Sequence, residues 1–361
     1  MRVGVAPGRP ALGDLAHTAT PSWRRPAVVA GVGVIALAVS LLAGIAFGSV
    51  SIPLGDTVAI LAHRLLGWPV AVTWPASSET IILELRLPRV LMAMFAGGGL
   101  AVAGATMQGV LRNPLADPYV LGTASGAALG ASLAVLVPIQ LGVLGLGLTQ
   151  LLAFIGAVVA VALVWRLSRA SRLGSLTGLL LTGYAVGSLL AAGLAMAMVL
   201  SGAQLRQIVF FLLGSLATAT WQQVAVAAPL ITVGVAVLAW RARALDALML
   251  GDETAAHLGL AVARERVILL ACAALVTAAA VATCGLIGFV GLVVPHMVRL
   301  VVGPAARPLL PLAAIFGAAF LALADLLARL PGELPVGIVT AVIGAPFFLL
   351  ILRHVRTGYE L

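Results

Sequence analysis

The residues of this chain that could do chemistry are few, and their spacing completes no catalytic or metal-binding set. Asp325 and Arg329 lie one helical turn apart and can pair with each other. His296 could ligate a metal or a haem, but the sequence offers no second ligand, so a packed and hydrogen-bonded histidine is the better interpretation. Cys272 and Cys284 have no CxxC spacing and no neighbouring histidine, which favours packing over redox or metal chemistry. We therefore predict no catalytic residue and no metal site in this chain.

The sequence also lacks the residues for phosphate transfer. Lysine is absent, so all 21 residues of the lysine and arginine count are arginines, and the phosphate-binding loop of nucleotide hydrolases requires a Gly-Lys-Ser/Thr step. Any ATP hydrolysis must be done by another chain, and we expect this chain not to be an enzyme. The arginines lie scattered at segment ends and do not gather into a patch with aromatic residues, so nucleic acid is not an expected partner.

Composition places the elements that carry these residues in a lipid bilayer. Apolar residues make up 62% of the chain, charged residues make up 9%, and the mean hydropathy is +1.17, whereas a soluble domain is ~45–50% apolar. At about 20 residues per crossing, the apolar segments predict an all-α polytopic membrane protein with ten transmembrane helices. The expected spans are 27–48, 88–110, 119–137, 148–167, 175–200, 223–240, 267–284, 288–302, 309–328 and 335–352.

The glycine content predicts how these helices pack. Glycine accounts for 40 of the 361 residues, a larger share than the usual ~7%. It recurs at the spacing of helix contacts, as in Gly183 with Gly187. The spacing predicts a tightly packed bundle, but receptors and membrane enzymes use it as well as transporters.

The distribution of arginine predicts the orientation. With the N-terminus in the cytoplasm, 16 arginines fall on inner segments and five on outer segments, in keeping with the excess of positive charge on cytoplasmic loops. We expect a multi-pass protein of the cell (inner or plasma) membrane with both termini in the cytoplasm. Residues 1–26 are expected to be a flexible cytoplasmic tail, 27–354 a single transmembrane domain, and 355–361 a cytoplasmic C-terminal tail.

Two hydrophilic segments lie on opposite sides of the expected membrane. In the outer segment 50–87, Pro53 can open an amphipathic helix that lies on the outer surface as a scaffold. The inner segment 241–266 contains four of the 21 arginines, and Asp252 and Glu253 suit a helix start there. Gly259 is expected to divide it into two short helices. An amphipathic helix facing the cytoplasm offers a docking surface, and a solvated connector without a partner is the alternative.

Six strings of the sequence resemble one family in their order and spacing. The strings are RLPR at Arg86–Arg89, QGVLRNPLADPYVLGTASGAALGA at Gln108–Ala131, LGDETAAHLGL at Leu250–Leu260, GLIGFVGLVVPHMVRLVVG at Gly285–Gly303, LLPLAAIFGAAFLALADLLAR at Leu309–Arg329 and ELPVGIVTAVIGAPFFL at Glu333–Leu349. They are similar to the permease subunits of type II ABC importers for iron chelates, haem and vitamin B12, the FecCD-like family.

The resemblance implies partners as well as a fold. It implies a homodimer of ten-span subunits in membrane lipid, two cytoplasmic ATPase subunits and an extracytoplasmic substrate-binding protein. The ATP and magnesium would sit on the ATPase, and no cofactor would sit in this chain. Such an assembly would move a ferric siderophore, or haem or cobalamin, into the cytoplasm by alternating access.

The resemblance also assigns roles to residues, which fall into three groups. The outer arginines that would meet acidic residues of the binding protein are Arg86, Arg89 and Arg329. The residues that would seat in a groove of the ATPase are Gly251, Asp252, Glu253, His257, Leu258 and Gly259. The cytoplasmic gate would be formed by Asn113, Leu115, Leu176 and Thr177, although the family's usual pair of small hydroxyl residues is only half present at the last two positions.

The sequence departs from the family at one place and leaves two other classes of protein open. The loop 330–332 is shorter than in the family, which makes the docking role of Arg329 less secure than that of Arg86 and Arg89. An ion-coupled secondary transporter would need ionisable residues at mid-membrane, which this chain almost lacks. A membrane scaffold or receptor that transports nothing is compatible with composition alone.

Overall fold

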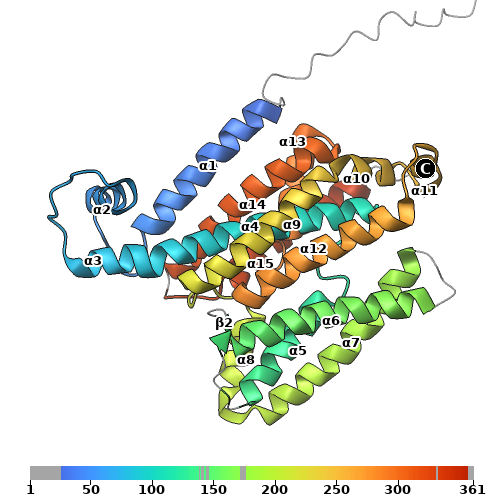
Figure 1. Cartoon of the computed structure of the whole chain (residues 1–361), viewed down its shortest axis with the longest axis horizontal. Coiled ribbons are helices and arrows are strands. Elements are labelled where there is room, and N and C mark those ends of the chain that lie inside the picture. The colour runs from blue at the N-terminus through green and yellow to red at the C-terminus, as the bar shows by residue number, and fades with distance from the viewer. Residues whose placement is uncertain are drawn as a thin grey trace, which may run out of the picture.

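The computed structural model describes residues 26–137, 139, 142–143, 146–170, 176–330 and 332–356. Nearly all of this part of the chain is helical, and the strands within it form one antiparallel pair, β1 (Gly142–Val143) with β2 (Leu146–Gly147), in which Val143 faces Leu146 (Figure 1). The tail expected over residues 1–26 lies outside the described residues except for Pro26, where the first helix begins.

Seven helical segments of the described chain are long and apolar enough to cross a membrane. They are α1 (Pro26–Ala46), the continuous segment Ala76–Val110, α6 (Leu148–Ala170), α7 (Leu176–Leu200), α9 (Trp221–Trp240), α12 (Val262–Cys284) and α14 (Ala306–Arg329). Three shorter apolar helices are α5 (Thr123–Leu136), α13 (Val290–Val302) and α15 (Val336–Arg356). The all-α membrane fold is confirmed, and each expected span contains one of these helices. The count of ten crossings stays a prediction.

The core of the protein surrounds one central helix, α4 (Leu87–Val110). It packs against α9, α12, α13 and α14, and nearly all of its residues are buried. Glycine allows this close packing: a Cβ at Gly104 would lie 2.0 Å from the carbonyl oxygen of Gly291, and one at Gly97 would lie 2.3 Å from that of Gly317. Helices whose backbones touch gain dispersion and packing energy that lipid cannot supply. The predicted tight packing is therefore confirmed.

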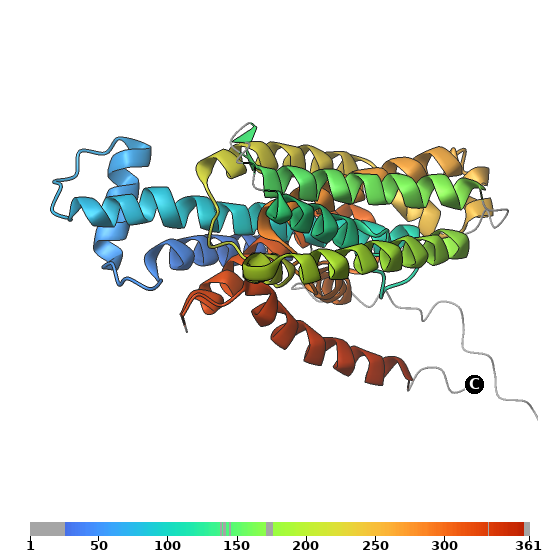
Figure 2. The same ribbon diagram turned by 90° about the horizontal axis from the view of Figure 1, so that it is seen from below.

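A second group of helices, α5, α6 and α7, lies beside this core. Figure 1 shows them together with α8 (Leu205–Leu212) as a layer below the central helices, and contacts of α12 with α6 and α5 join the two groups. Figure 2 shows α15 diverging from the bundle toward its C-terminal end. Helix α15 reaches Arg356, so it includes the first residues of the tail expected from residue 355.

The outer segment begins as expected but ends earlier. Helix α2 (Leu54–Leu66) starts directly after Pro53, as predicted. The next helix begins at Ala76, well before the expected boundary at residue 87, and continues through α3 (Ala76–Thr80) and the π-helical turn η2 (Ile81–Arg86) into α4. Pro88 cannot donate a backbone hydrogen bond and crowds the preceding turn. The wider π-helical turn directly before it accommodates Pro88, so the helix does not stop there.

The inner segment is divided at Gly259, as expected, and also at Gly251, which was not expected. Helix α10 (Ala242–Met249) is separated from α11 (Asp252–His257) by Leu250 and Gly251, and Gly259 lies in the turn between α11 and α12. Gly251 has φ of 115° and ψ of 155°, a conformation that residues with a Cβ avoid. Gly259 also has a positive φ, of 82°, so each glycine follows the end of one short helix. Figures 1 and 2 place α2 and α11 at opposite ends of the molecule.

Candidate functional site

The end of the protein that is expected to face the cytoplasm presents helix α11 to solvent. Asp252, Glu253 and His257 are exposed on it, while Ala255 is fully buried against the rest of the protein. Leu258, directly after the helix, is 65% exposed, an unusual position for a large apolar side chain at a hydrophilic end. All six residues expected to meet an ATPase thus lie on α11 or directly next to it.

Asp252 does not point freely into solvent, because two arginines hold its carboxylate. Nη2 of Arg266 donates to both carboxylate oxygens at 2.7 and 2.8 Å, and Nη2 of Arg112 contacts Oδ1. The hydrogen bonds from Arg266 and the charges of both arginines hold the pKa of Asp252 below its ordinary value. The carboxylate therefore stays ionised at neutral pH and joins α11 to two other parts of the chain.

Arg112 connects this surface to the segment that follows α4. Its Nε donates to the carbonyl oxygen of Leu248 at 2.9 Å, so one side chain contacts the C-terminal end of α10 and the N-terminal end of α11 together. Arg112 has a φ of 50°, a left-handed conformation that is uncommon outside glycine. The chain turns there, out of α4 and into the segment that contains Asn113 and Leu115.

Leu115 lies in the segment that follows α4, and its gating role stays a prediction. The carbonyl of the Asn113 side chain accepts the amide of Leu115 at 2.9 Å, which fixes the turn. Leu115 borders a cavity of only about 10 Å³ together with His296 of α13 and Phe347 of α15, a space with room for one water molecule at most. The ring centroids of His296 and Phe347 are 6.3 Å apart in an edge-to-face arrangement, so His296 packs in an apolar contact.

The second pair of expected gate residues lies elsewhere in the described structure. Leu176 and Thr177 form the first turn of α7, where Leu176 packs against the main core and Thr177 is exposed. Residues 171–175, directly before them, lie outside the described part of the chain. No contact given for the described residues brings this turn to Leu115, and its gating role stays a prediction.

Two residues of the same gate segment were not singled out from the sequence. The hydroxyl of Tyr119 donates to the carbonyl oxygen of Ile287 at 2.9 Å and accepts the amide of Ile287 at 3.2 Å. Asp117 is half-buried and accepts the amide of Tyr119 at 2.8 Å. These contacts join the segment to the turn between α12 and α13. Asp117 and Tyr119 stand in the string ADPY of the sequence. No local pattern indicated their role, because the partner of the Tyr119 hydroxyl, Ile287, lies 168 residues away.

At the outer end, Arg86 holds the end of α1 and is not an exposed docking residue. Its side chain is 6% exposed, and its guanidinium donates to the carbonyl oxygens of Ile45 at 2.9 Å, Ala46 at 2.7 Å and Val50. The last carbonyls of a helix have no partner within it and carry partial negative charge. They attract Arg86, which was expected on the outer surface.

Arg89 and Arg329 are buried in one charged cluster. Arg89 donates from Nε and Nη2 to Asp325 at 3.0 to 3.1 Å, and from Nη1 to Glu333 at 2.7 Å. Arg329 pairs with Asp325 at 3.0 Å, as the sequence predicted, and donates to the carbonyl oxygen of Gly44 at 3.0 Å. Asp325 is 1% exposed, whereas the side chain of Glu333 is 43% exposed. In this arrangement Glu333 is the member of the cluster that reaches solvent.

These polar partners explain why the three arginines are buried. An unpaired buried charge is costly, and each guanidinium here has carboxylate or carbonyl partners. The expectation that Arg86, Arg89 and Arg329 lie exposed is therefore wrong for this conformation. Their contact with a binding protein stays a prediction. The shortened loop includes Gly332 with φ of 114° and Glu333 with φ of 61°, a tight turn beside the cluster.

The fold and the two ends together define a class of protein. A bundle of apolar helices with a small hydrophilic surface at one end is the architecture of a multi-pass membrane protein. A family model described as the FecCD transport family matches residues 36–354. The chain belongs to this family of ABC importer permeases.

Relatives and a solved structure agree with that assignment. A cobalamin import system permease protein BtuC of Halobacterium salinarum is 41% identical over 342 residues, which cover 90% of this chain and 92% of that protein. A hemin transport system permease protein HmuU of Yersinia pestis is 45% identical over 280 residues, covering 76% and 84%. A solved structure described as an inward-facing conformation of a metal-chelate type ABC transporter has a TM-score of 0.79 and 29% identity, covering 91% of this chain and all of that one.

Proposed function

We propose that this chain is the permease through which a metal chelate, namely a ferric siderophore or alternatively haem or cobalamin, enters the cytoplasm by alternating access driven by ATP on a partner subunit. The names of its relatives support this range of cargo, because they include permeases for cobalamin, hemin and Fe(3+) dicitrate. In this proposal two copies of the chain assemble with two ATPase subunits and one substrate-binding protein.

One observation carries the proposal: the exposed surface of α11 is connected to the gate segment by Arg112. Movement of α11 by a partner would be transmitted through the Arg112 contacts with Leu248 and Asp252. The gate residue Leu115 lies three positions further along the chain. Because Leu115 lies beside His296 and Phe347, a displacement of the segment would change this contact.

The outer end supports entry of a large solute. A cavity of about 650 Å³ is bordered by α5, α8 and the end of α12, a volume within the usual range for ligand pockets. Its lining mixes apolar residues with hydroxyl, amide and charged side chains, among them Gln150, Arg206, Ser215, Thr218, Thr283 and Glu333. We propose that cargo released by the binding protein passes this cavity on its way to the gate.

The orientation and docking follow as parts of the same proposal. The excess of arginine at the end that carries α11 favours a cytoplasmic position for that end. The opposite end, with Glu333 and Arg206 exposed, would then meet the binding protein. Charges of this kind steer and orient an encounter more than they add affinity.

The test is uptake by proteoliposomes that contain this chain with its partner ATPase. Vesicles would be supplied with ATP inside, a binding protein outside, and labelled ferric siderophore, haem or cobalamin in turn. The proposal expects accumulation of one chelate that requires both ATP and the binding protein. A partner ATPase that binds but cannot hydrolyse ATP is the matched control. Uptake driven by an ion gradient without ATP, or by the chain alone, would overturn it.

A further inference from the structure

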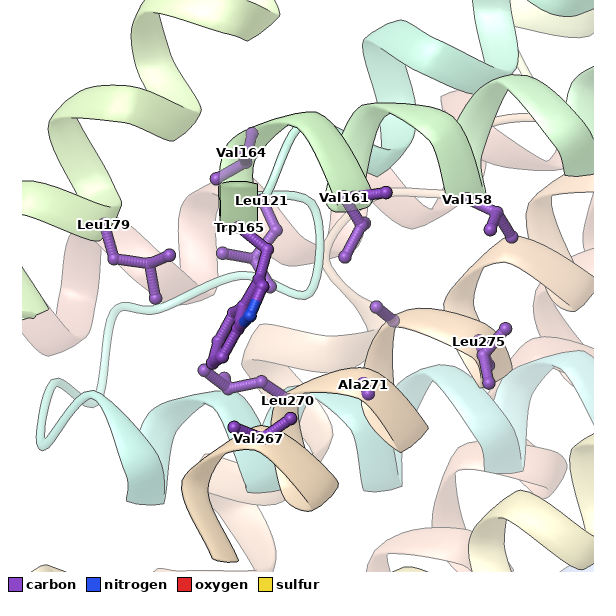
Figure 3. A pocket seen from close by; sticks show the side chains of 12 residues that line it. Leu121, Val158, Val161, Val164, Trp165, Leu179, Val267, Leu270, Ala271 and Leu275 are labelled. Atoms are coloured by element: carbon purple, nitrogen blue, oxygen red, sulfur yellow. The ribbon is translucent and has the colours of Figure 1, made fainter. Parts of the chain in front are cut away.

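A second cavity lies between α6 and α12, away from the gate and from the outer end. It has a volume of about 350 Å³ and is lined by Leu121, Val158, Val161, Ala162, Val164, Trp165, Leu179, Val267, Leu270, Ala271, Ala274 and Leu275. Figure 3 shows Trp165 extending from α6 across the cavity toward Val267 and Leu270 of α12. Apart from the indole nitrogen, the lining side chains contain no polar atom, so the cavity suits a hydrocarbon and not a hydrated or metal-chelating solute.

The charges beside this cavity lie at one of its ends. The guanidinium of Arg169 lies 5.5 Å from the centroid of the Trp165 ring, and Arg169 is exposed. On the facing helix, Arg264 is exposed and lies one turn before the lining residue Val267, so the two share a helix face. Both arginines belong to the ends of α6 and α12 nearest the α11 surface.

Unlike Arg266 and Arg241 near the same end of α12, these two arginines have no acidic partner among the described residues. Arg266 is paired with Asp252, and Arg241 is paired with Glu265 at 2.7 Å. Within the part of the chain that the structure describes, Arg169 and Arg264 take part in no ion pair. An apolar cavity between two helices therefore has, on the same helices, two positive charges without an acidic partner in the described part of the chain, and the Trp165 ring lies between the cavity and Arg169.

We infer that this cavity binds one anionic phospholipid. An acyl chain occupies the space between α6 and α12, and the phosphate contacts Arg169 and Arg264. Arginine binds phosphate with several donors at once, and basic sites between transmembrane helices recognise anionic headgroups. Amphipathic aromatic rings such as the indole of Trp165 favour the boundary between the acyl chains and the headgroups of a membrane. The inference uses only the membrane location of the chain, so it stands or falls independently of cargo and of ATP.

The experiment measures quenching of Trp165 fluorescence in the full chain. Vesicles would contain a low, equal mole fraction of either phosphatidylglycerol or phosphatidylcholine with brominated acyl chains, which quench an indole on contact. The signal of Trp165 is the difference between the natural chain and Trp165→Phe. We expect stronger quenching by phosphatidylglycerol than by phosphatidylcholine, and a relative affinity that falls roughly fivefold for each arginine replaced in Arg169→Gln and Arg264→Gln.

Two further variants control for folding and for location. Arg307→Gln removes an exposed arginine at the start of α14, outside the cavity, and should leave the lipid preference unchanged. Ala271→Phe fills the cavity and should remove the preference while the rim arginines remain. Equal quenching by both lipids would overturn the inference, and so would a preference that survives both rim substitutions or the filling of the cavity. A preference lost equally in Arg307→Gln would show a general surface attraction and would also overturn it.

Discussion

Nε of Arg112 lies 2.9 Å from the carbonyl oxygen of Leu248, and the same guanidinium contacts the carboxylate of Asp252. One side chain at the end of the central helix thus holds both short helices of the inner surface. Because Arg112 directly precedes the proposed gate segment, its loss is expected to separate the proposed docking surface from the proposed gate without removing either of them.

Replacing Arg112 should uncouple transport. In Arg112→Gln the charge-assisted contacts, worth roughly 1.5–3 kcal/mol, are lost, so we expect ATP-dependent uptake to fall by about tenfold or more. Membrane insertion and ATPase binding should persist. Uptake and ATP hydrolysis by the reconstituted assembly are the measurements. Arg243→Gln, an exposed arginine of α10 with no ion pair among the described residues, is the control. Equal loss in both variants would contradict a specific role for Arg112.

Substitutions on the exposed face of α11 should weaken the effect of the partner. Glu253→Ala removes an exposed acidic side chain, and Gly259→Val places a branched residue at a φ of 82°, a strain of order 1–3 kcal/mol. We expect both to reduce stimulation of the ATPase by the permease while the protein still reaches the membrane. Glu84→Ala, exposed near the opposite end, is the matched control. Unchanged stimulation and uptake in both variants would refute docking through α11.

The outer cluster should be a stability element. Asp325→Asn leaves the buried Arg89 and Arg329 without their shared carboxylate, and breaking a buried pair costs roughly 3–5 kcal/mol. We expect a marked fall in the thermal unfolding temperature of the purified protein. Glu333→Gln, at a half-exposed partner of Arg89, should have a much smaller effect. A similar melting temperature for Asp325→Asn and the natural chain would show that the cluster contributes little.

The contact around Asp252 should tolerate acid. Because the folded-state pKa of Asp252 lies below its ordinary value, its contribution is fully present above the unfolded pKa, ~3.9, and is lost only as the pH falls through the lower folded value. Titration of Asp252 should therefore not change the binding of the ATPase between pH 8 and about pH 5. Arg266→Gln removes the main cause of the shift and should raise the pH at which binding weakens. Identical pH profiles would contradict this assignment.

The helical membrane fold was predictable from the sequence because it depends on local properties. A run of apolar residues long enough to cross hydrocarbon must form a helix, since every backbone group there needs a partner. Pro53 and the glycine spacing were equally local signals, and both were interpreted correctly. The helix break at Gly251 was missed, because the sequence alone did not show that Gly251 as well as Gly259 adopts a positive φ.

The position of the charged residues was decided by the tertiary structure. Arg86 and Arg89 stand in a short string that resembles an exposed docking motif, yet their partners at Ile45 and Asp325 lie 41 and 236 residues away. The contact between Arg112 and Asp252 spans 140 residues. Hydropathy and charge patterns are read along the chain, whereas burial of a charge depends on which distant groups fold against it. The sequence by itself therefore determined the membrane, the helices and the family resemblance, and only the folded arrangement decided which charges face solvent and which hold the bundle together.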